Sequence, residues 1–418
     1  MTESIRTYRP GDEETIANLL RKCFGTYNSY GLDSSKWLEL AKLNEGFKLE
    51  GAYLLEIDGK PISHVQVVEK RLRTSAGILK TAGIANVSTD PEYRGKGYAS
   101  RLLSYVMEDY KQKGFPLTAL FTGYASSPQR IYRRLGYVDI CLDSWWIAPI
   151  WDAQENMREV RWIEVREAEE RDVEHVRKVY ETSGSLYTGW PIRSESEYRE
   201  KMFARTAYHS FFYLPRSPRN FAVAEEGDEV IGYAVAAKVP WDPEGFGIAE
   251  LIALPGRTDA LQALYTYIVK RASEEGARYI RAPKIPGADY ARLFSRFRAQ
   301  GGGGVFMCEI LNFKAVLENI FTCKTAFLDG LTLKLKYRSE SVTISVKEGE
   351  AEKGGNSVGA VVDLDPETFN KFLFGCSSAE KLLLNSIVKA DVPAKRILRL
   401  LKELFPPKLM HIWLIDHW

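Results

Sequence analysis

Residues Val87 to Ala99 read VSTDPEYRGKGYA. The stretch begins as an apolar strand and passes two glycines, Gly95 and Gly97, before a helix with an apolar stripe. Small residues let a backbone approach a ligand closely, and the first turn of a helix offers unpaired N–H groups and the positive end of its dipole. Arg94 and Lys96 add positive charge. The stretch therefore predicts a pyrophosphate-binding loop between a strand and a helix.

The residues of this loop allow three other interpretations. Two glycines can serve a tight strand-to-helix turn and bind nothing, but the position between a strand and an amphipathic helix favours a ligand site. A Walker loop is excluded because the chain has no GxxxxGK[ST] motif. A dinucleotide fingerprint is excluded because no GxGxxG follows the first strand.

Outward from the loop, the first 150 residues alternate short strands and helices. Asp58-Gly59 between two apolar runs predicts a hairpin, because both residue types tolerate positive φ. The order is that of a mixed sheet with helices on its faces. Strands are predicted at 5–10, 52–57, 61–68, 80–89 and 117–121 and from 136, and helices at 16–23, 98–113 and 131–135.

The same order begins again near Trp162, which indicates an internal repeat. Here, however, the strand ending at Leu254 leads into a loop without the two-glycine pattern. Asp259, at the start of the following helix, would repel a phosphate. The second copy is therefore predicted to bind no cofactor, and Gly301 to Gly304 are interpreted as a flexible turn.

From about residue 311 the pattern changes to half-buried antiparallel strands at 331–337 and 341–346, followed by helices. The final segment, 406–418, is rich in aromatic residues and is predicted to dock on the protein. The chain of 418 residues is too long for a single core. We expect an α/β fold of three domains, 1–150, 151–310 and 311–418.

Composition excludes several classes of protein. The formal net charge is +2 with no block of like charges, so nucleic-acid binding has no support. The five cysteines are dispersed, which disfavours a disulfide framework or a zinc site, and no metal is expected. No basic-apolar leader and no apolar run of about 20 residues is found, so we expect a cytoplasmic protein without a membrane partner.

Two motifs carry a resemblance to a known family. Arg94 to Ala99 is similar to the [Q/R]-x-x-G-x-[G/A] signature of the GNAT acetyltransferases, and Ile131 to Tyr137 resembles the later Y-x-x-x-G-[FY] segment of that superfamily. Two GNAT-like domains followed by a sterol-carrier-protein-like domain resemble the enhanced-intracellular-survival (Eis) acetyltransferases. The similarity covers essentially the whole chain.

The resemblance implies how acetyl-coenzyme A would be held. The strand before the loop would pair with the pantetheine arm, the loop and helix start would bind the pyrophosphate, and the segment after residue 121 would line the thioester end. The residues concerned are Val87, Ser88, Thr89, Arg94, Gly95, Lys96, Gly97, Tyr98, Ala99, Ser100, Ser126 and Ser127.

The resemblance also implies candidates for catalysis. Tyr132 would be the general acid that protonates the departing thiolate; the alternative is a packing aromatic of a short helix. The terminal carboxylate at Trp418 would be the base, or the end of the chain is docked for structure alone. Asp416 or His417 could substitute for it, or the amine could arrive neutral from solution.

Asp33 and Trp37 stand where the family places residues that recognise a cationic amine, although a tryptophan packed under a surface helix is the equal alternative. The expected activity is acetyl transfer to a primary amine of an aminoglycoside, a polyamine-like molecule or a lysine. A non-catalytic acyl-coenzyme A-binding or regulatory protein is the second hypothesis, and a lipid carrier the third. The resemblance implies a homo-oligomer such as a hexamer.

Overall fold

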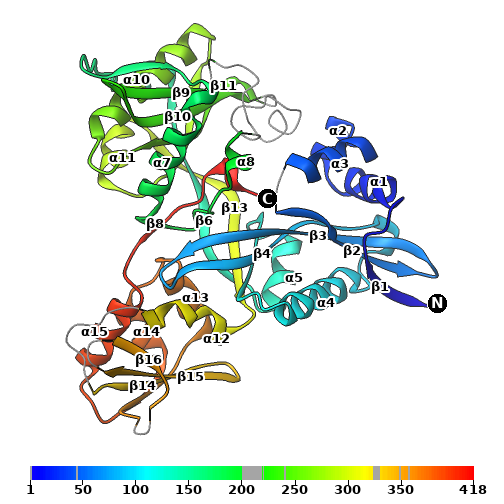
Figure 1. Cartoon of the computed structure of the whole chain (residues 1–418). Helices are drawn as coiled ribbons and strands as arrows, with labels where there is room; N and C mark the ends of the chain where they lie inside the picture. The colour runs from blue at the N-terminus through cyan, green and yellow to red at the C-terminus, as the bar shows by residue number, and fades with distance from the viewer. Residues whose placement is uncertain are drawn as a thin grey trace.

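A computed structural model describes residues 2–43, 46–199, 219, 221–239, 242–322, 330–347, 350–355 and 358–418. Twelve strands form one continuous sheet in the order β1-β2-β3-β4-β5-β13-β6-β12-β11-β10-β9-β7, and five more form a second sheet in the order β16-β15-β14-β17-β18. Figure 1 shows the two halves of the large sheet and, below them, the small sheet with its helices. The mixed α/β fold expected from the sequence is confirmed.

The first repeat follows the predicted order of elements. Asp58 (φ 49°) and Gly59 (φ 78°) form the predicted tight turn between β2 and β3. The elements are β1 (Glu3–Thr7), α1 (Glu13–Cys23), α2 (Gly25–Tyr30), α3 (Ser34–Leu43), β2 (Phe47–Ile57), β3 (Lys60–Thr74), β4 (Gly77–Thr89), α4 (Tyr98–Gln112), β5 (Leu117–Gly123), α5 (Ser127–Arg134), β6 (Val138–Pro149) and α6 (Ile150–Gln154).

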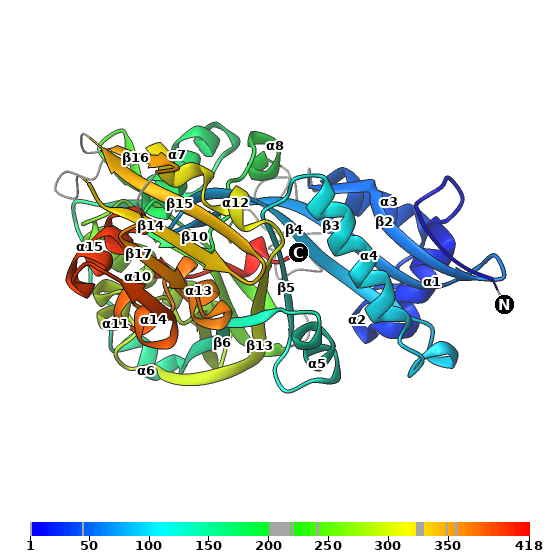
Figure 2. The same cartoon turned by 90° about the horizontal axis from the view of Figure 1, so that it is seen from below.

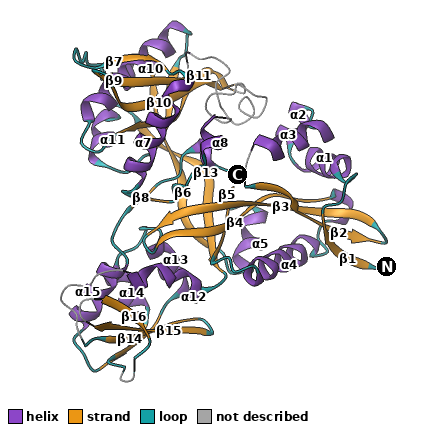
Figure 3. Ribbon diagram, viewed as in Figure 1, coloured by secondary structure: helices purple, strands orange, loops and turns teal. Residues whose placement is uncertain are grey.

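Helices cover both faces of this half of the sheet. Helices α1–α3 lie on one face and α4 and α5 on the other (Figures 1 and 3). Figure 2 shows α4 crossing the strands of the first repeat from below. The apolar stripe of α4, Leu102, Leu103 and Val106, is buried against the sheet, as the helical spacing predicts.

The second repeat has the same order, with α10 and α11 in the places of α4 and α5. Its elements are β7 (Glu164–Glu167), α7 (Val173–Gly184), β8 (Tyr187–Thr188), α8 (Glu195–Tyr198), β9 (Phe221–Glu226), β10 (Glu229–Val239), β11 (Asp242–Ala253), α10 (Thr258–Glu274), β12 (Tyr279–Pro283), α11 (Ala288–Leu293) and β13 (Arg298–Ile310). The internal repeat is thus present in the fold.

The two repeats exchange their last strands. Strand β13, which ends the second repeat, lies between β5 and β6 of the first, while β6 pairs with β12 of the second. Gly301 to Gly304 belong to β13, so the prediction of a flexible turn is wrong. Glycine suits a bulge that must make room for neighbouring side chains.

The C-terminal part begins with α12 (Phe313–Val316) and ends in a segment that leaves its own domain. Its other elements are β14 (Thr332–Tyr337), β15 (Glu340–Lys347), β16 (Glu350–Lys353), β17 (Ala360–Asp363), α13 (Pro366–Leu373), α14 (Ala379–Asn385), β18 (Ile387–Ala390), α15 (Ala394–Leu404) and β19 (Leu409–Met410). The last segment pairs with β8 of the second repeat and then runs on to the first (Figure 1). No helix in the described ranges combines the length and apolar character needed to cross a membrane.

Candidate active site

Strands β4 and β5 separate halfway along their length. They are paired in parallel from Thr81 with Leu117 to Ile84 with Leu120, and no later pair between them occurs in the described residues. Strand β5 continues on its other side with β13 as far as Gly123. A bulge in β4 at Asn86, where φ is 53°, turns the strand away at this point. Val87, Ser88 and Thr89 therefore lie beside an opening between two strands, and the ligand-pairing role that the resemblance implies for them stays a prediction.

The loop after β4 has the geometry of an anion site. Gly95 and Gly97 both adopt a φ of 79°, which residues with a Cβ rarely tolerate, and a Cβ at Gly95 would meet nothing within 4 Å. Gly97 caps α4, which leaves the N–H groups of Tyr98, Ala99 and Ser100 without partners inside the helix.

Side chains around the loop hold it and give it positive charge. Nε of Arg94 donates to the Thr89 carbonyl oxygen at 3.1 Å, so this cation anchors the loop to the end of β4. The ammonium groups of Lys96 and Lys60 lie 5.5 and 5.6 Å from the ring centre of Tyr93. The site thus combines backbone donors with a cationic rim, which suits a pyrophosphate.

Tyr132 lies at the α5 side of this opening. The residue is 6% exposed and packs in the core beneath α4, and its hydroxyl has no hydrogen-bond partner in the described part of the chain. Burial raises the pKa of the Tyr132 phenol, so the hydroxyl stays protonated at neutral pH. It is therefore available as a proton donor.

Ser126 and Ser127 stand at the start of α5. The Ser126 hydroxyl accepts the Gln129 N–H and caps the helix, while Ser127 Oγ accepts a hydrogen bond from Arg130 at 2.9 Å. Ser126 is thus one of the residues that position Tyr132. Whether either serine lines the thioester end stays a prediction.

The end of the chain docks on the opposite face of the same strands. The ring of His417 stacks on Phe121 at 3.8 Å between centroids, and the ring of Trp418 lies 5.0 Å from Phe121. Phe121 directly follows the last residue of β5 that pairs with β4. Because successive side chains of a strand point to opposite faces, Leu120 faces the core of Tyr132 while Phe121 faces the terminal segment.

Tyr132 and Trp418 thus lie on opposite faces of the sheet, beside the opening between β4 and β5. The predicted docking of the aromatic terminus is confirmed. A substrate group held in the opening would have one of these residues on each side.

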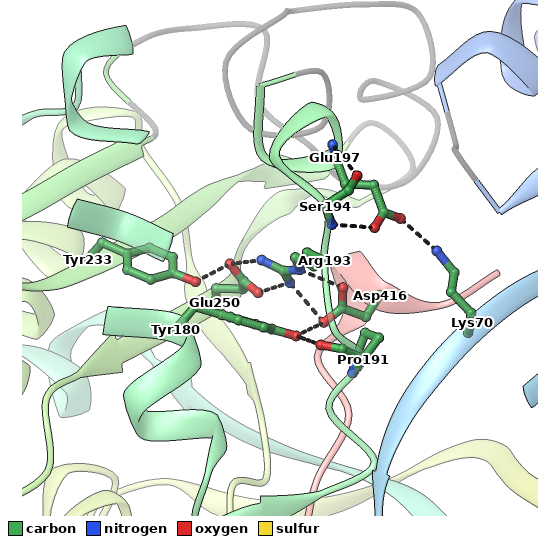
Figure 4. Close-up of polar contacts among 9 residues, drawn as sticks. All are labelled: Lys70, Tyr180, Pro191, Arg193, Ser194, Glu197, Tyr233, Glu250 and Asp416. Carbon is green, nitrogen blue, oxygen red and sulfur yellow. Dashed lines mark hydrogen bonds and ion pairs between the residues drawn. The ribbon is translucent and has the colours of Figure 1, made fainter. Parts of the chain in front are cut away.

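A buried ion cluster fixes the segment that carries Trp418 (Figure 4). Arg193 lies between two carboxylates: it donates to Asp416 from Nε and Nη2 at 2.8 Å each, and it pairs with Glu250 of β11. Tyr180 donates to Asp416 and Tyr233 to Glu250, both at 3.0 Å. Asp416 is therefore bound in the core of the second repeat, which removes it from the candidates for the base.

His417 remains chemically suited to that role. Burial lowers the pKa of its imidazole, so the ring is neutral at physiological pH and has a free nitrogen lone pair, but it is a weaker base than an exposed histidine. The sequence left the terminal carboxylate of Trp418 and the His417 ring open as alternatives, and the rings of both residues lie against Phe121.

The second repeat differs from the first in the side chain that stands at the separation of its strands. Strands β11 and β12 also separate, after the pair Gly247–Arg281. Tyr290 of α11 takes the place that Tyr132 has in α5, but its hydroxyl donates to the carbonyl oxygen of Leu251 at 2.8 Å, beyond that separation.

The loop of the second repeat holds an internal carboxylate instead of an anion site. The side chain of Asp259 accepts the Ala260 N–H at 2.9 Å at the start of α10. The neighbouring Arg257 lowers the pKa of Asp259 to about 2, so this carboxylate is ionised. Arg257 forms a bidentate ion pair with this carboxylate at the start of α10, and the absence of a cofactor from the second copy stays a prediction.

Asp33 and Trp37 are placed in the α1–α3 layer. Trp37 has 0% of its surface exposed and packs between Tyr8 and Phe47, with ring centres 5.8 and 5.7 Å away. Asp33 accepts the Lys36 N–H at 2.8 Å at the start of α3. This placement favours the packing alternative for Trp37 and gives Asp33 a structural task.

Sequence reasoning missed the residues that organise the centre of the molecule. Arg193, Glu250 and Asp416 come from three distant segments, so no local spacing joins them. A faint signal existed for Glu250 alone, since a charged residue inside the apolar run Ile248–Leu254 needs a buried partner.

Comparison with known proteins agrees with this geometry. Residues 4–139 match the family model of the acetyltransferase (GNAT) domain. A stretch of 149 residues is 26% identical to an uncharacterized N-acetyltransferase of Methanocaldococcus jannaschii; it covers 32% of this chain and 61% of that protein, less than two thirds of its length.

Solved structures share the fold of the entire chain. A conserved protein of unknown function from Enterococcus faecalis superposes with a TM-score of 0.74 at 17% identity, and Eis1 from Mycobacterium abscessus with 0.65 at 14% identity, each covering 100% of both chains. The resemblance to a GNAT domain and to the Eis fold is thereby confirmed.

Proposed function

We propose that this GNAT-fold protein is an N-acetyltransferase that moves the acetyl group of acetyl-coenzyme A directly to a primary amine. The observation that carries the proposal is the contrast between the two repeats. In the first, the strands separate beside an exposed two-glycine loop and an unpartnered tyrosine. In the second, a tyrosine and an aspartate occupy the equivalent places.

Residues of the first repeat fit the co-substrate. The N–H groups from Arg94 to Ser100 would hold the pyrophosphate, with Arg94 and Lys96 as cations. The edge of β4 at Val87, Ser88 and Thr89 would pair with the pantetheine arm. A Cβ-free approach at Gly95 and the separated strands supply the room that such a molecule needs.

The chemistry assigned to the chain is a balanced acyl transfer. The amine nitrogen forms a bond to the acetyl carbon, the carbon–sulfur bond breaks, and Tyr132 donates a proton to the sulfur. The nitrogen loses a proton to the base on the other face, which we assign to the terminal carboxylate at Trp418 with His417 beside it. The products are an N-acetyl amide and free thiol.

The test is release of free thiol from acetyl-coenzyme A in the presence of a panel of amines: an aminoglycoside, a polyamine and a lysine peptide. We expect amine-dependent release with at least one class. Tight binding of acetyl-coenzyme A without any amine-dependent release would instead support a non-catalytic binding protein. Two glycines added after Trp418 should slow the reaction about tenfold or more, whereas the same two residues added before Met1 should not.

The homo-oligomeric assembly and the sterol-carrier-like nature of residues 311–418 stay predictions. Sedimentation of the full chain decides the first. Residues 311–418 resemble sterol carrier proteins only in layout. We therefore expect no binding when lipid binding to the full protein is measured.

A further inference from the structure

A cavity of about 90 Å³ lies next to the opening between β4 and β5. Its walls come from β5, β6, β13, the end of β12 and the terminal segment. It reaches Phe121, the residue at which β5 has just parted from β4, and His417, which stacks on it. The cavity therefore adjoins the place where the proposed reaction occurs, on the face that carries the terminal residues.

One wall of the cavity holds an unpaired carboxylate. Asp143 of β6 lines the cavity, and in the described residues no cation and no hydrogen-bond donor pairs with it. Carboxylate oxygens in a partly buried wall can accept hydrogen bonds from an ammonium group that enters the cavity. This feature points to a cationic ligand.

The four-glycine bulge of β13 makes room for Asp143. Gly301 pairs with Ser144 and Val305 with Leu142, so three glycines lie opposite Asp143 alone. A Cβ at Gly304 would come within 2.0 Å of Asp143 Oδ2. The backbone is thus shaped around this carboxylate.

Of the other titratable groups that line the cavity, the two histidines carry no positive charge at physiological pH, whereas Lys284 does. Burial lowers the pKa of His411 to about 3 and that of His417 as well, so both imidazoles are neutral at physiological pH. Nε2 of His411 is buried without a partner among the described residues. The ammonium of exposed Lys284 lies 5.7 Å from the ring centre of Trp146 and forms no ion pair with Asp143.

We propose that this cavity binds a cationic aminoalkyl arm of the amine acceptor, with Asp143 as its counter-ion and a specificity-determining residue. The proposal rests on the proposed function. A cavity of about 150 Å³ is filled by one benzene ring, so the smaller space described here fits a linear chain and not the rings of an aminoglycoside. The acceptor class is therefore a diamine or polyamine, or a lysine next to a second cation, with one nitrogen on Asp143 and another at the thioester.

The experiment compares 1,4-diaminobutane with 1-aminobutane, which lacks the second cation. We expect the Kd and the KM of the wild-type protein for the diamine to be at least about tenfold lower than those for 1-aminobutane. A tenfold difference is typical of one charge-assisted hydrogen bond. Asp143→Asn should remove this preference and leave the KM for acetyl-coenzyme A unchanged. Asp228→Asn, in an exposed turn between β9 and β10, is the control that removes the same charge elsewhere.

Gly304→Ala provides a second variant. The Asp143 carboxylate stays in the protein, but the added Cβ moves it from its position. We expect Gly304→Ala to weaken binding of the diamine more than binding of 1-aminobutane. Asp143→Asn should keep the melting temperature of the wild type. Equal diamine affinity in wild type, Asp143→Asn and Asp228→Asn would overturn the proposal, as would an equal loss for both amines. If no variant releases thiol but calorimetry still shows that Asp143→Asn loses the diamine, the proposed reaction fails and the cavity assignment stands.

Discussion

The indole of Trp418 lies directly against Gly83 of β4: a Cβ on Gly83 would come within 2.6 Å of Nε1 of Trp418. Gly83 is one residue before Ile84, the last residue of β4 that pairs with β5. The absence of a side chain therefore gives the terminal residue its seat on the sheet, where the strands begin to part. A glycine inside a strand often marks such a close approach.

Gly83→Ala should lower kcat about tenfold or more by displacing Trp418, with a smaller effect on the KM for acetyl-coenzyme A. The same Cβ would meet the Val68 carbonyl oxygen at 2.6 Å, so a change in stability must be separated from a loss of docking. Trp418→Ala and the double variant complete a cycle. Because both changes remove one contact, the double variant should be no slower than Trp418→Ala, and additive losses would contradict the assignment.

Tyr132→Phe should reduce kcat about 100-fold, the usual scale for loss of a general acid, with little change in KM. Tyr290→Phe is the matched control in the second repeat. It removes a buried hydrogen bond to Leu251 and should lower stability by about 1 kcal/mol without slowing the reaction. Single-turnover kinetics measure the effect on the reaction, and thermal melts measure the effect on stability. Equal rates for both variants would contradict the role of Tyr132 as general acid.

Gly97→Ala should raise the KM for acetyl-coenzyme A about tenfold or more, because a residue with a Cβ at a φ of 79° costs about 1–2 kcal/mol and shifts the N–H groups that follow. Gly256→Ala introduces the same strain, at a φ of 84°, into the loop of the second repeat. That variant should lose similar stability and keep its KM. A rise in KM for both variants would show that strain alone, and not the loss of an anion site, is responsible.

Local patterns allowed the β4–loop–α4 unit to be predicted closely. Gly95, Gly97 and the stripe of Leu102, Leu103 and Val106 act within one turn of their own position, so their signal is in the sequence itself. Tyr132 was found through its motif and sits on a helix that begins four residues earlier than predicted, because Ser126 caps it. Local physics sets such boundaries once the cap is recognised.

The exchange of β6 and β13 could not be predicted, because both strands are apolar enough to fit either repeat and only the assembled sheet decides their partners. The role of Trp37 could not be predicted either. A tryptophan can pack in a core or bind a cation, and only its burial in the fold distinguishes the two. Asp143 is similar, since the room for its carboxylate comes from Gly304 on the neighbouring strand β13, which is far away in the sequence.

Arg193→Met should lower the free energy of unfolding by about 3–5 kcal/mol, because it leaves Asp416 and Glu250 buried without a counter-ion. It should also reduce kcat, since Asp416 would no longer hold the terminal segment. Arg199→Met is the control, because its ion pairs with Glu170 and Glu195 are on the surface, where solvent screens them and their loss changes stability little. Urea denaturation measures the free energy of unfolding of both variants. Equal values would contradict a stabilising role for the buried ion cluster.

His64→Gln should make the protein less sensitive to acid. His64 is fully buried beside the β4 bulge, where its Nδ1 lies 3.2 Å from the Asn86 carbonyl oxygen, and burial lowers its pKa from 6.5 to about 4. Between these two pKa values the unfolded chain binds a proton at His64 and the folded protein does not. The free energy of unfolding is therefore unaffected by His64 above pH 6.5 and decreases as the pH drops to about 4. The loss is about 3 kcal/mol. Urea denaturation at pH 7 and at pH 4.5 should show a smaller decrease for His64→Gln than for the wild type, and the exposed His175→Gln should match the wild type. An identical decrease in all three proteins would mean that His64 does not titrate in this way and that His411 and His417 account for the acid sensitivity.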